Sequence, residues 1–248
     1  MWGTTVHAAS FGGKPTFDLL RGGANRMKKI LLTSIFLAVP TLAAAQEQQH
    51  TAYIEGGVGA AFTQSVSTKQ FSYTDPMNSF SGRAELDYGT QFTVGGEIGL
   101  NFFNGRVRSG ISYDYANATV RSATLIGTLN GASVSGPFSR SALGSVASSF
   151  DNTVHVIALN VYYNFLSPDA QIQPYIGAGF GSGIIQTAKN NEFVVTGTVG
   201  ARIRVSDQIY VGARYKFTHI EGITDKIGIR YDPIEFHTVS AIIGFYFL

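Results

Sequence analysis

Eight segments of the chain alternate apolar residues with polar or small residues at a period of two. They are residues 53–62, 84–101, 106–116, 154–165, 174–184, 193–204, 209–217 and a last run that follows Pro233 and ends at the C-terminus. Successive side chains of a β-strand point to opposite faces of its sheet, so each segment has one apolar face and one polar or small face. The pattern therefore predicts an all-β chain built on eight strands.

The segment 174–184 carries an unusual concentration of glycine. One face holds four glycines, which we name the interior glycine wall: Gly177, Gly179, Gly181 and Gly183. The other face holds mainly apolar side chains: Ile176, Ala178, Phe180 and Ile184. A helix would lose about 1 kcal/mol at each glycine relative to alanine, and a phosphate-binding loop needs a helix directly after it, which the sequence does not offer. We expect a strand whose apolar face looks outward and whose glycines leave room for bulky interior side chains.

Residues 27–45 have the three parts of a secretory signal peptide. Residues 27–29 are Met-Lys-Lys, residues 30–39 are apolar, and residues 43–45 are the three alanines of a cleavage site before Gln46. The apolar run is too short for a transmembrane helix, which needs about 20 residues. We interpret residues 1–26 as an upstream extension from a start codon assigned too early, and residues 46–248 as the mature barrel domain.

Charge and cysteine content narrow the class of protein. Residues 1–45 contain five of the 18 Lys and Arg residues and one of the 16 Asp and Glu residues, so the mature part has a net charge of −2. It has no basic patch to suggest nucleic acid as a partner. The chain has no cysteine, so an exported form cannot be stabilised by disulfides. These features leave a soluble exported barrel or an outer-membrane barrel.

The connections between the eight runs alternate in length. In chain order they are long, short, long, short, medium, short and medium, and the two long ones are residues 63–83 and 117–152. The dipeptide Asn104-Gly105 predicts a tight hairpin turn at the first short one. An outer-membrane barrel has short periplasmic turns and longer extracellular loops, with both chain ends in the periplasm. The order therefore favours an eight-stranded antiparallel up-and-down transmembrane β-barrel over a soluble one.

The charged residues of the runs fall on the face opposite the apolar one. They are Glu55, Glu97, Arg106, Arg108, Asp114, Arg202, Arg204, Arg214 and Lys216. A membrane barrel turns its apolar face toward lipid, so these charges are expected inside, where they must pair. We interpret six of them as a structural interior polar network: Glu55, Glu97, Arg108, Asp114, Arg202 and Arg214. Because eight strands enclose only enough space for side chains, a filled lumen is favoured over a pore, a proton path or a catalytic cluster.

In several motifs the chain resembles the small eight-stranded outer-membrane barrels of the opacity, surface-antigen and OmpA-like kind, a porin-type family. The motifs are residues 160–165 (Asn-Val-Tyr-Tyr-Asn-Phe), 174–179 (Pro-Tyr-Ile-Gly-Ala-Gly), 212–215 (Gly-Ala-Arg-Tyr) and the C-terminal strand. The resemblance covers nearly all of residues 46–248. It implies the bacterial outer membrane as location, lipid as surroundings and a C-terminal strand read by the barrel-assembly machinery. Family members usually end in an aromatic residue, whereas this chain ends in Leu248, so the register of the last strand stays open.

Three functions are compatible with this reading of the chain. The first is a surface protein in which the barrel is an anchor and loops 63–83 and 117–152 contact the outside, in adhesion, surface antigenicity or envelope integrity. An extracellular or host ligand at those loops is the expected partner, although their low charge equally describes mobile, solvated loops. The second function is a narrow porin or small-ligand carrier that uses the polar interior.

The third function, a membrane-embedded hydrolase, is the least favoured. It would use His155 with Ser149 and Asp151, or His237 with Ser240, and neither spacing defines a catalytic geometry. Both histidines are expected at the membrane rim, where a half-polar ring is well placed. The remaining histidines are too scattered to suggest a metal site. We therefore predict a protein that is not an enzyme and needs neither cofactor nor metal.

Overall fold

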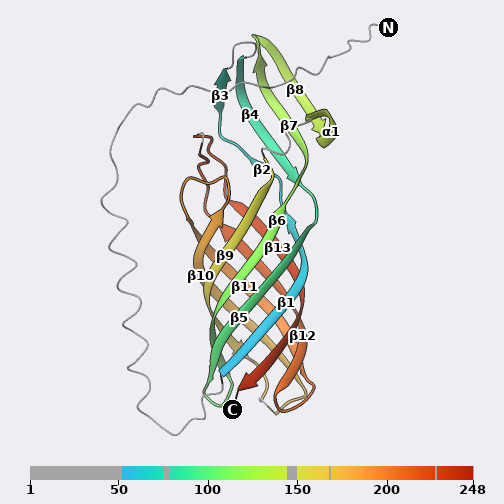
Figure 1. Cartoon of the computed structure of the whole chain (residues 1–248), viewed down its shortest axis with the longest axis vertical. Helices are drawn as coiled ribbons and strands as arrows, with labels where there is room; N and C mark the ends of the chain where they lie inside the picture. Colours follow the sequence, from blue (N-terminus) through green and yellow to red (C-terminus); the bar gives the residue numbers. More distant parts are fainter. Residues whose placement is uncertain (1–51, 75–78, 144–149, 168, 227, 248) are drawn as a thin grey trace, which may run out of the picture.

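The computed structural model describes residues 52–74, 79–143, 150–167, 169–226 and 228–247. Eight of its strands form a closed antiparallel barrel (Figure 1). They are β1 (Ala52–Thr63), β5 (Gln91–Phe102), β6 (Val107–Ala118), β9 (Asn152–Asn164), β10 (Ile172–Ile185), β11 (Glu192–Arg204), β12 (Ile209–Ile220) and β13 (Ile234–Phe247). Each strand pairs with the next of these along the chain, and β13 closes the barrel by pairing with β1. The predicted eight-stranded up-and-down barrel is confirmed.

The seam between β1 and β13 settles the register of the last strand. Ala52 pairs with Phe247 and Thr63 with Phe236, so β1 begins where β13 ends (Figure 1). Phe245 and Phe247 are exposed on the outer wall, and Tyr246 points inward to accept a hydrogen bond from the Arg202 guanidinium. The outward aromatic at the end of the strand is thus Phe247. Leu248 and the predicted signal peptide lie outside the described residues.

Short turns join the strands at the end of the barrel that holds both ends of the barrel chain. They comprise residues 103–106, 165–171 and 205–208. In the first, Phe103, Asn104 and Gly105 have φ angles of 52°, 53° and 77°. This left-handed backbone is costly for most residues and easy for Asn-Gly, which confirms the hairpin turn predicted there. By the length rule of outer-membrane barrels, this is the periplasmic end.

The outer wall of the barrel is apolar on every strand. Its exposed side chains include Ile54, Phe92, Ile98, Ile111, Leu159, Val161, Ile176, Phe180, Val195, Val199, Val211, Val239 and Ile243. A soluble protein rarely exposes so large a continuous apolar surface. A bilayer accepts it, because closure of the ladder leaves no backbone donor or acceptor unpaired in the hydrocarbon. In the described part of the chain, no helix has the length and hydropathy to span a membrane.

The two long connections are not the loops that the sequence suggested. Residues 63–83 and 117–152 contain β2 (Val66–Ser67), β3 (Phe71–Thr74), the first half of β4 (Ser79–Tyr88), β7 (Val120–Leu129), β8 (Ala132–Ser139) and the single helical turn α1 (Arg140–Leu143). The five strands form a second antiparallel sheet beyond the extracellular end of the barrel (Figure 1). The interpretation of these connections as loops was wrong for the described residues, because strands run through both of them.

Strand pairing continues from the barrel into this extracellular sheet. β5 and β6 are barrel neighbours, and their chain continuations β4 and β7 pair with each other from Tyr88↔Val120 up to Phe80↔Leu129. The predicted run 84–101 is therefore two strands, separated at Gly89 and Thr90. The β7–β8 hairpin turns at Asn130-Gly131, with φ angles of 51° and 81°. This dipeptide was a hairpin signal that the sequence interpretation missed, because small residues hide the alternation on both sides.

An apolar cluster occupies the extracellular end of the lumen and the base of the extracellular sheet. Its buried members from the sheet include Val66, Leu86 and Val120. Members from the barrel and its other connections include Val154, Val156, Ile185, Val194, Ile220, Ile223, Ile234 and Phe236. We call this set the upper apolar cluster. Because both sets bury their side chains against each other, the sheet is packed onto the barrel and shares its core.

Replacing Phe180 with Arg tests the direction of the outer wall. Phe180 is 42% exposed and lies mid-strand on β10, where the wall should face the hydrocarbon. An Arg at the bilayer midplane costs about 2–4 kcal/mol, so we expect a loss of that size in the free energy of unfolding measured in lipid vesicles. The control is Ser135→Arg on an exposed position of β8, where we expect almost no change. Equal stability of both variants would mean that this face does not meet lipid.

Candidate functional site

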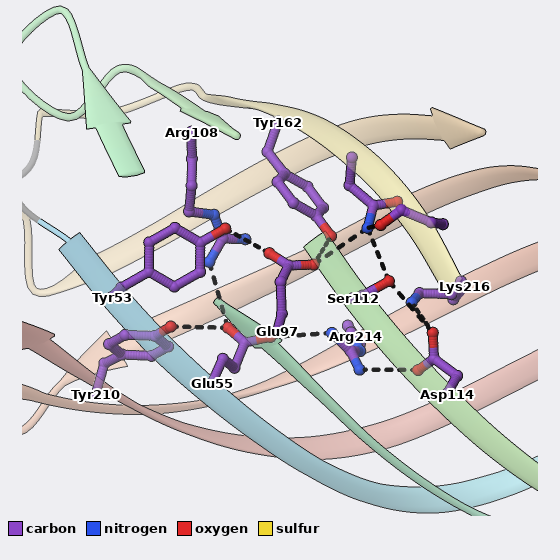
Figure 2. A network of polar contacts seen from close by, with 12 residues as sticks. Tyr53, Glu55, Glu97, Arg108, Ser112, Asp114, Tyr162, Tyr210, Arg214 and Lys216 are labelled. Atoms are coloured by element: carbon purple, nitrogen blue, oxygen red, sulfur yellow. Dashed lines mark hydrogen bonds and ion pairs between the residues drawn. The ribbon is translucent and has the colours of Figure 1, made fainter. Parts of the chain in front are cut away.

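Glu55 is the centre of the buried polar network in the barrel. Glu55 is only 2% exposed, and its carboxylate lies between two guanidinium groups (Figure 2). Arg108 Nη1 is 3.3 Å from Glu55 Oε2, and Arg214 Nη1 is 3.0 Å from Glu55 Oε1. The Tyr210 hydroxyl donates a third hydrogen bond to Oε2 at 2.9 Å. Glu55 lies on β1, Arg108 on β6, and Tyr210 and Arg214 on β12. These strands lie on different sides of the barrel, so the contacts cross the lumen.

Asp114 extends this chain of charges toward the extracellular side. Lys216 Nζ lies 2.7 Å from Asp114 Oδ2, and Arg214 Nη2 lies 3.6 Å from Asp114 Oδ1 (Figure 2). Arg214 therefore bridges Glu55 and Asp114. Lys216 is 3% exposed, so without Asp114 its ammonium would be a buried unpaired charge, which is strongly destabilising.

Glu97 is held by neutral donors. It accepts hydrogen bonds from the Tyr53 and Tyr162 hydroxyls, each at 2.5 Å, and from Asn160 Nδ2 at 3.3 Å (Figure 2). The Arg108 guanidinium lies over the rings of these two tyrosines, with 4.9 Å and 4.3 Å to their centroids. Tyr53 and Tyr162 thus link Glu97 to Arg108. Their hydroxyls donate to the carboxylate, and their ring faces contact the guanidinium cation.

Arg202 forms a separate group near the periplasmic end. It donates to Asn164 Oδ1 at 2.8 Å and to the Tyr246 hydroxyl at 2.7 Å. Its guanidinium lies 5.5 Å and 5.0 Å from the ring centroids of Tyr175 and Tyr210. Neutral acceptors and aromatic faces therefore take the place of a carboxylate for this buried cation.

The structure places all six residues of the expected interior network inside the barrel, together with Lys216. Asp114 is partly buried, and the others are buried. Two other charged residues that the alternation assigned to the interior face lie outside the network. Arg106 is exposed in the turn after β5, and Arg204 lies at the periplasmic rim, 3.7 Å from the exposed Asp169. The alternation of the sequence places Tyr162 and Tyr210 on the interior face, but it does not show which charges the tyrosines and asparagines connect, because their partners are far apart along the chain.

The interior glycines lie where bulky side chains of the next strand need room. Gly177 is paired with Tyr162, and a Cβ there would overlap the Tyr162 ring. Three further cross-strand pairs repeat this arrangement: Tyr53↔Gly99, Tyr175↔Gly200 and Tyr210↔Gly244. In each pair a Cβ on the glycine would meet the tyrosine at well below van der Waals distance. Four of the five interior tyrosines that contact the arginines are thus matched by a glycine.

The other glycines of the interior glycine wall meet different neighbours. A Cβ on Gly179 would overlap Asn160 Oδ1 and lie 2.7 Å from Thr196 Oγ1. On Gly181 it would meet the backbone of β9, and on Gly183 it would approach a Val194 methyl group at 3.0 Å. All four positions are therefore closely packed, and none opens onto an empty channel.

The lumen is filled at two levels. The polar network fills its periplasmic and central parts, and the upper apolar cluster fills the extracellular end. A cavity of about 10 Å³ between the barrel top and the extracellular connections is lined by Tyr88, Val154 and Ile234 among others. That volume holds about one water.

An ion pair fastens the extracellular sheet to the barrel. Arg140 donates to both carboxylate oxygens of Asp151, at 2.8 Å and 2.7 Å, and to the Val120 carbonyl at 2.8 Å. The Val120 amide donates in turn to Asp151 at 2.9 Å. Hydrogen bonding by the guanidinium lowers the pKa of the Asp151 carboxyl. The pair therefore stabilises the fold at neutral pH, and this contribution is lost as the pH falls through the lowered pKa.

The alternative hydrolase residues are not brought together. His237 lies on the outer wall, whereas Ser240 is buried toward the lumen, so the barrel wall separates them. Asp151 is engaged by Arg140, and Ser149 lies outside the described residues. His155 instead accepts or donates a hydrogen bond with the Tyr113 hydroxyl. Within the described ranges, no group of three or more His, Asp or Glu side chains could hold a metal ion.

Closed strand pairing, an apolar outer wall and a filled polar lumen together define an integral β-barrel of the outer-membrane class. The family model of the outer membrane protein beta-barrel domain matches residues 30–247, and the chain belongs to that family. This membership indicates the bacterial outer membrane as its location and supports the resemblance drawn from the sequence motifs.

Solved structures of three other proteins are similar to this chain at low sequence identity. Neisserial surface protein A shares 13% identity over 79% of this chain and 97% of its own, with a TM-score of 0.49. OprG from Pseudomonas aeruginosa shares 12% identity over 79% of this chain and 95% of its own, with a TM-score of 0.43. The N-terminal barrel domain of OprF from the same organism shares 13% identity over 79% and 97%, with a TM-score of 0.36. No curated protein matches the sequence significantly.

The charge of Glu55 can be tested by replacing it with Gln. The variant leaves Arg108 and Arg214 buried without their shared carboxylate, which should lower the free energy of unfolding by about 3–5 kcal/mol in denaturant titrations in lipid vesicles. The matched control is Asp169→Asn, which removes the exposed partner of Arg204 and should leave stability unchanged. If Glu55→Gln is as stable as the parent, the network does not depend on this charge.

The fit between glycine and tyrosine can be tested by Gly177→Ala. The added methyl group would overlap the Tyr162 ring, and overpacking of this kind costs about 1–3 kcal/mol. Gly197→Ala on β11 is the control, because a Cβ there has no heavy atom within 4 Å among those described. The unfolding free energies of the two variants should differ by the cost of overpacking. A Gly177→Ala barrel as stable as Gly197→Ala would show that the space is open.

Proposed function

We propose that this protein is a surface anchor of the outer membrane, in which a filled barrel holds the extracellular sheet for contacts outside the cell. The observation that carries the proposal is the continuity of β5 with β4 and of β6 with β7, so that one pair of strands runs from the membrane into the sheet. The contacts belong to adhesion, to surface recognition as an antigen, or to envelope integrity.

The surface of the sheet supports a contact role. β8 is the last strand of the sheet and exposes Ser133, Ser135, Pro137 and Ser139. The serine hydroxyls can donate and accept hydrogen bonds with a polar partner such as a sugar or a protein surface. Packing through the upper apolar cluster holds this surface in place, so little ordering entropy would be lost on binding.

The filled lumen counts against the two other functions. A narrow porin or small-ligand carrier needs a continuous polar path, whereas the polar network is capped by the upper apolar cluster. A hydrolase needs a nucleophile, a base and an orienting group within hydrogen-bond reach. The barrel wall separates His237 from Ser240, and Asp151 near His155 is engaged by Arg140. We therefore propose a non-enzymatic protein without cofactor.

Export and assembly complete the proposal. Residues 27–45 would direct export and be removed, which leaves a chain that begins near β1. The barrel-assembly machinery would read β13, whose outer wall ends in Phe245 and Phe247. Outer-membrane lipid then surrounds the apolar wall.

A variant with a shortened extracellular sheet tests whether the barrel folds without the proposed contact surface. Ala123 pairs with Phe138 in the same kind of register position as Leu129 with Ala132, the pair that flanks Asn130-Gly131. Replacing residues 124–137 with Asn-Gly therefore moves the same turn to the base of the hairpin. We expect the unheated variant to keep the altered gel mobility of a closed barrel, since the barrel strands are unchanged.

Bacteria that carry the trimmed variant should lose adhesion to cultured epithelial cells, and the full chain should give no steady conductance in a planar bilayer. Detergent sensitivity of the same strains separates an adhesive role from a role in envelope integrity. Unchanged adhesion together with unchanged envelope resistance would contradict a contact role for the sheet. Reproducible single-channel steps would favour the porin alternative.

A further inference from the structure

Two Tyr–His pairs occupy equivalent positions on the outer wall. Tyr113 is the seventh residue of β6 and faces His155, the fourth residue of β9. Tyr215 is likewise the seventh residue of β12 and faces His237, the fourth residue of β13. In the order of strands around the barrel, two strands separate these two strand pairs on either side. The pairs therefore lie at the same height on opposite sides of the barrel.

The local geometry is the same in both pairs. The Tyr113 hydroxyl is 2.7 Å from His155 Nδ1, and the Tyr215 hydroxyl is 2.6 Å from His237 Nδ1. A second ring flanks each imidazole, with 5.4 Å between the ring centroids of Tyr115 and His155 and 5.4 Å between those of Phe217 and His237. Each imidazole is thus half-buried against two aromatic side chains.

The geometry leaves one nitrogen of each imidazole available. If the phenol donates to Nδ1, the neutral ring carries its proton on Nε2. The hydrogen bonds that the described side chains make to His155 and His237 both use Nδ1. A strand needs about 9–11 residues to cross the hydrocarbon, and β9 and β13 have 13 and 14. The fourth residue from the extracellular end therefore lies near the boundary between acyl chains and headgroups.

At that boundary the acceptors on offer are the oxygens of lipid headgroups, and phosphate is the strongest of them because it is charged. We propose that each Tyr–His pair binds the phosphate group of an outer-leaflet lipid through the Nε2–H of His155 or His237. The acyl chains of that lipid lie along the apolar wall below. This surface is continuous with the lipid contact that the barrel already makes.

The two sites differ in their charged neighbours. On the extracellular side of His237, the next outward pair of residues is His219 and Glu235, with 3.4 Å between Nδ1 and Oε1. The equivalent pair above His155 is Asn117 and Thr153, which carry no charge. A carboxylate near the bound phosphate repels it, so the site at His155 binds more tightly than the site at His237.

Lipid retention by the full chain tests the proposal. The protein is folded in a maltoside detergent, which has no phosphate, and phosphatidylglycerol is titrated in while native mass spectrometry counts the lipids retained. We expect two retained lipids of unequal affinity. His155→Phe should weaken the tighter site about tenfold and His237→Phe the weaker one, as expected for loss of a hydrogen bond to a charged group. His155→Gln, which keeps an N–H donor, should restore part of the loss.

Controls separate phosphate recognition from general lipid adhesion. Tyr163→Phe changes an outward tyrosine of β9 at the other rim and should leave both sites intact. Glu235→Gln should strengthen the His237 site toward the affinity of the other, which a purely apolar anchor would not do. Every variant must keep the heat-dependent gel shift of the folded barrel.

Three results would overturn the proposal. The first is equal lipid retention by the His155→Phe/His237→Phe double variant and the parent. The second is equal retention of a phosphate-free glycolipid, which would exclude phosphate as the recognised group. The third is complete displacement of the lipid by inorganic phosphate, which would assign the sites to the free anion.

Discussion

Closure of the backbone ladder between β1 and β13 is the constraint on which the rest of the structure depends. In hydrocarbon an open sheet edge would leave unpaired donors and acceptors, each costing several kcal/mol, so the eight strands must form a ring. A ring of eight strands encloses a space only wide enough for side chains. The alternation of each strand then places apolar side chains against lipid and all remaining residues in that narrow space. The composition of the lumen is therefore a consequence of closure.

Filling the lumen sets a second problem, because the side chains that fit there include buried cations. The structure solves it with Glu55 between Arg108 and Arg214, and with tyrosine rings that contact the arginines and donate to Glu97. The rings are large, so four of the five need a glycine on an adjacent strand, as Tyr175 needs Gly200. Charge balance, ring stacking and glycine placement are thus one arrangement. Changing any member alters the fit of the others.

The sequence predicted the faces of the barrel strands well, because lipid selects apolar residues at every second position. It placed Phe180 outside and Glu55 inside, as the structure does. It could not match Tyr210 with Gly244, because that pairing depends on the register of two strands joined by a connection too long to fix it as a tight turn would. It also could not show that Glu97 is held by phenols, since the donors come from β1 and β9 and meet Glu97 of β5 only in the closed barrel. The extracellular sheet was missed although Asn130-Gly131 marked its hairpin, because small residues in β7 and β8 weaken the alternation on which the prediction relied.

The extracellular sheet and the closed lumen depend on the same packed core. Val120 and Leu86 of the sheet pack in the same cluster as Val154 and Ile220 of the barrel, so the residues that cap the lumen also hold the sheet. Opening a path through the barrel would require moving this cluster and would loosen the sheet. A protein that transports through its lumen gains nothing from such coupling, whereas a protein that presents a surface gains rigidity from it. The shared core is therefore the strongest physical reason to view the barrel as a support for its extracellular face.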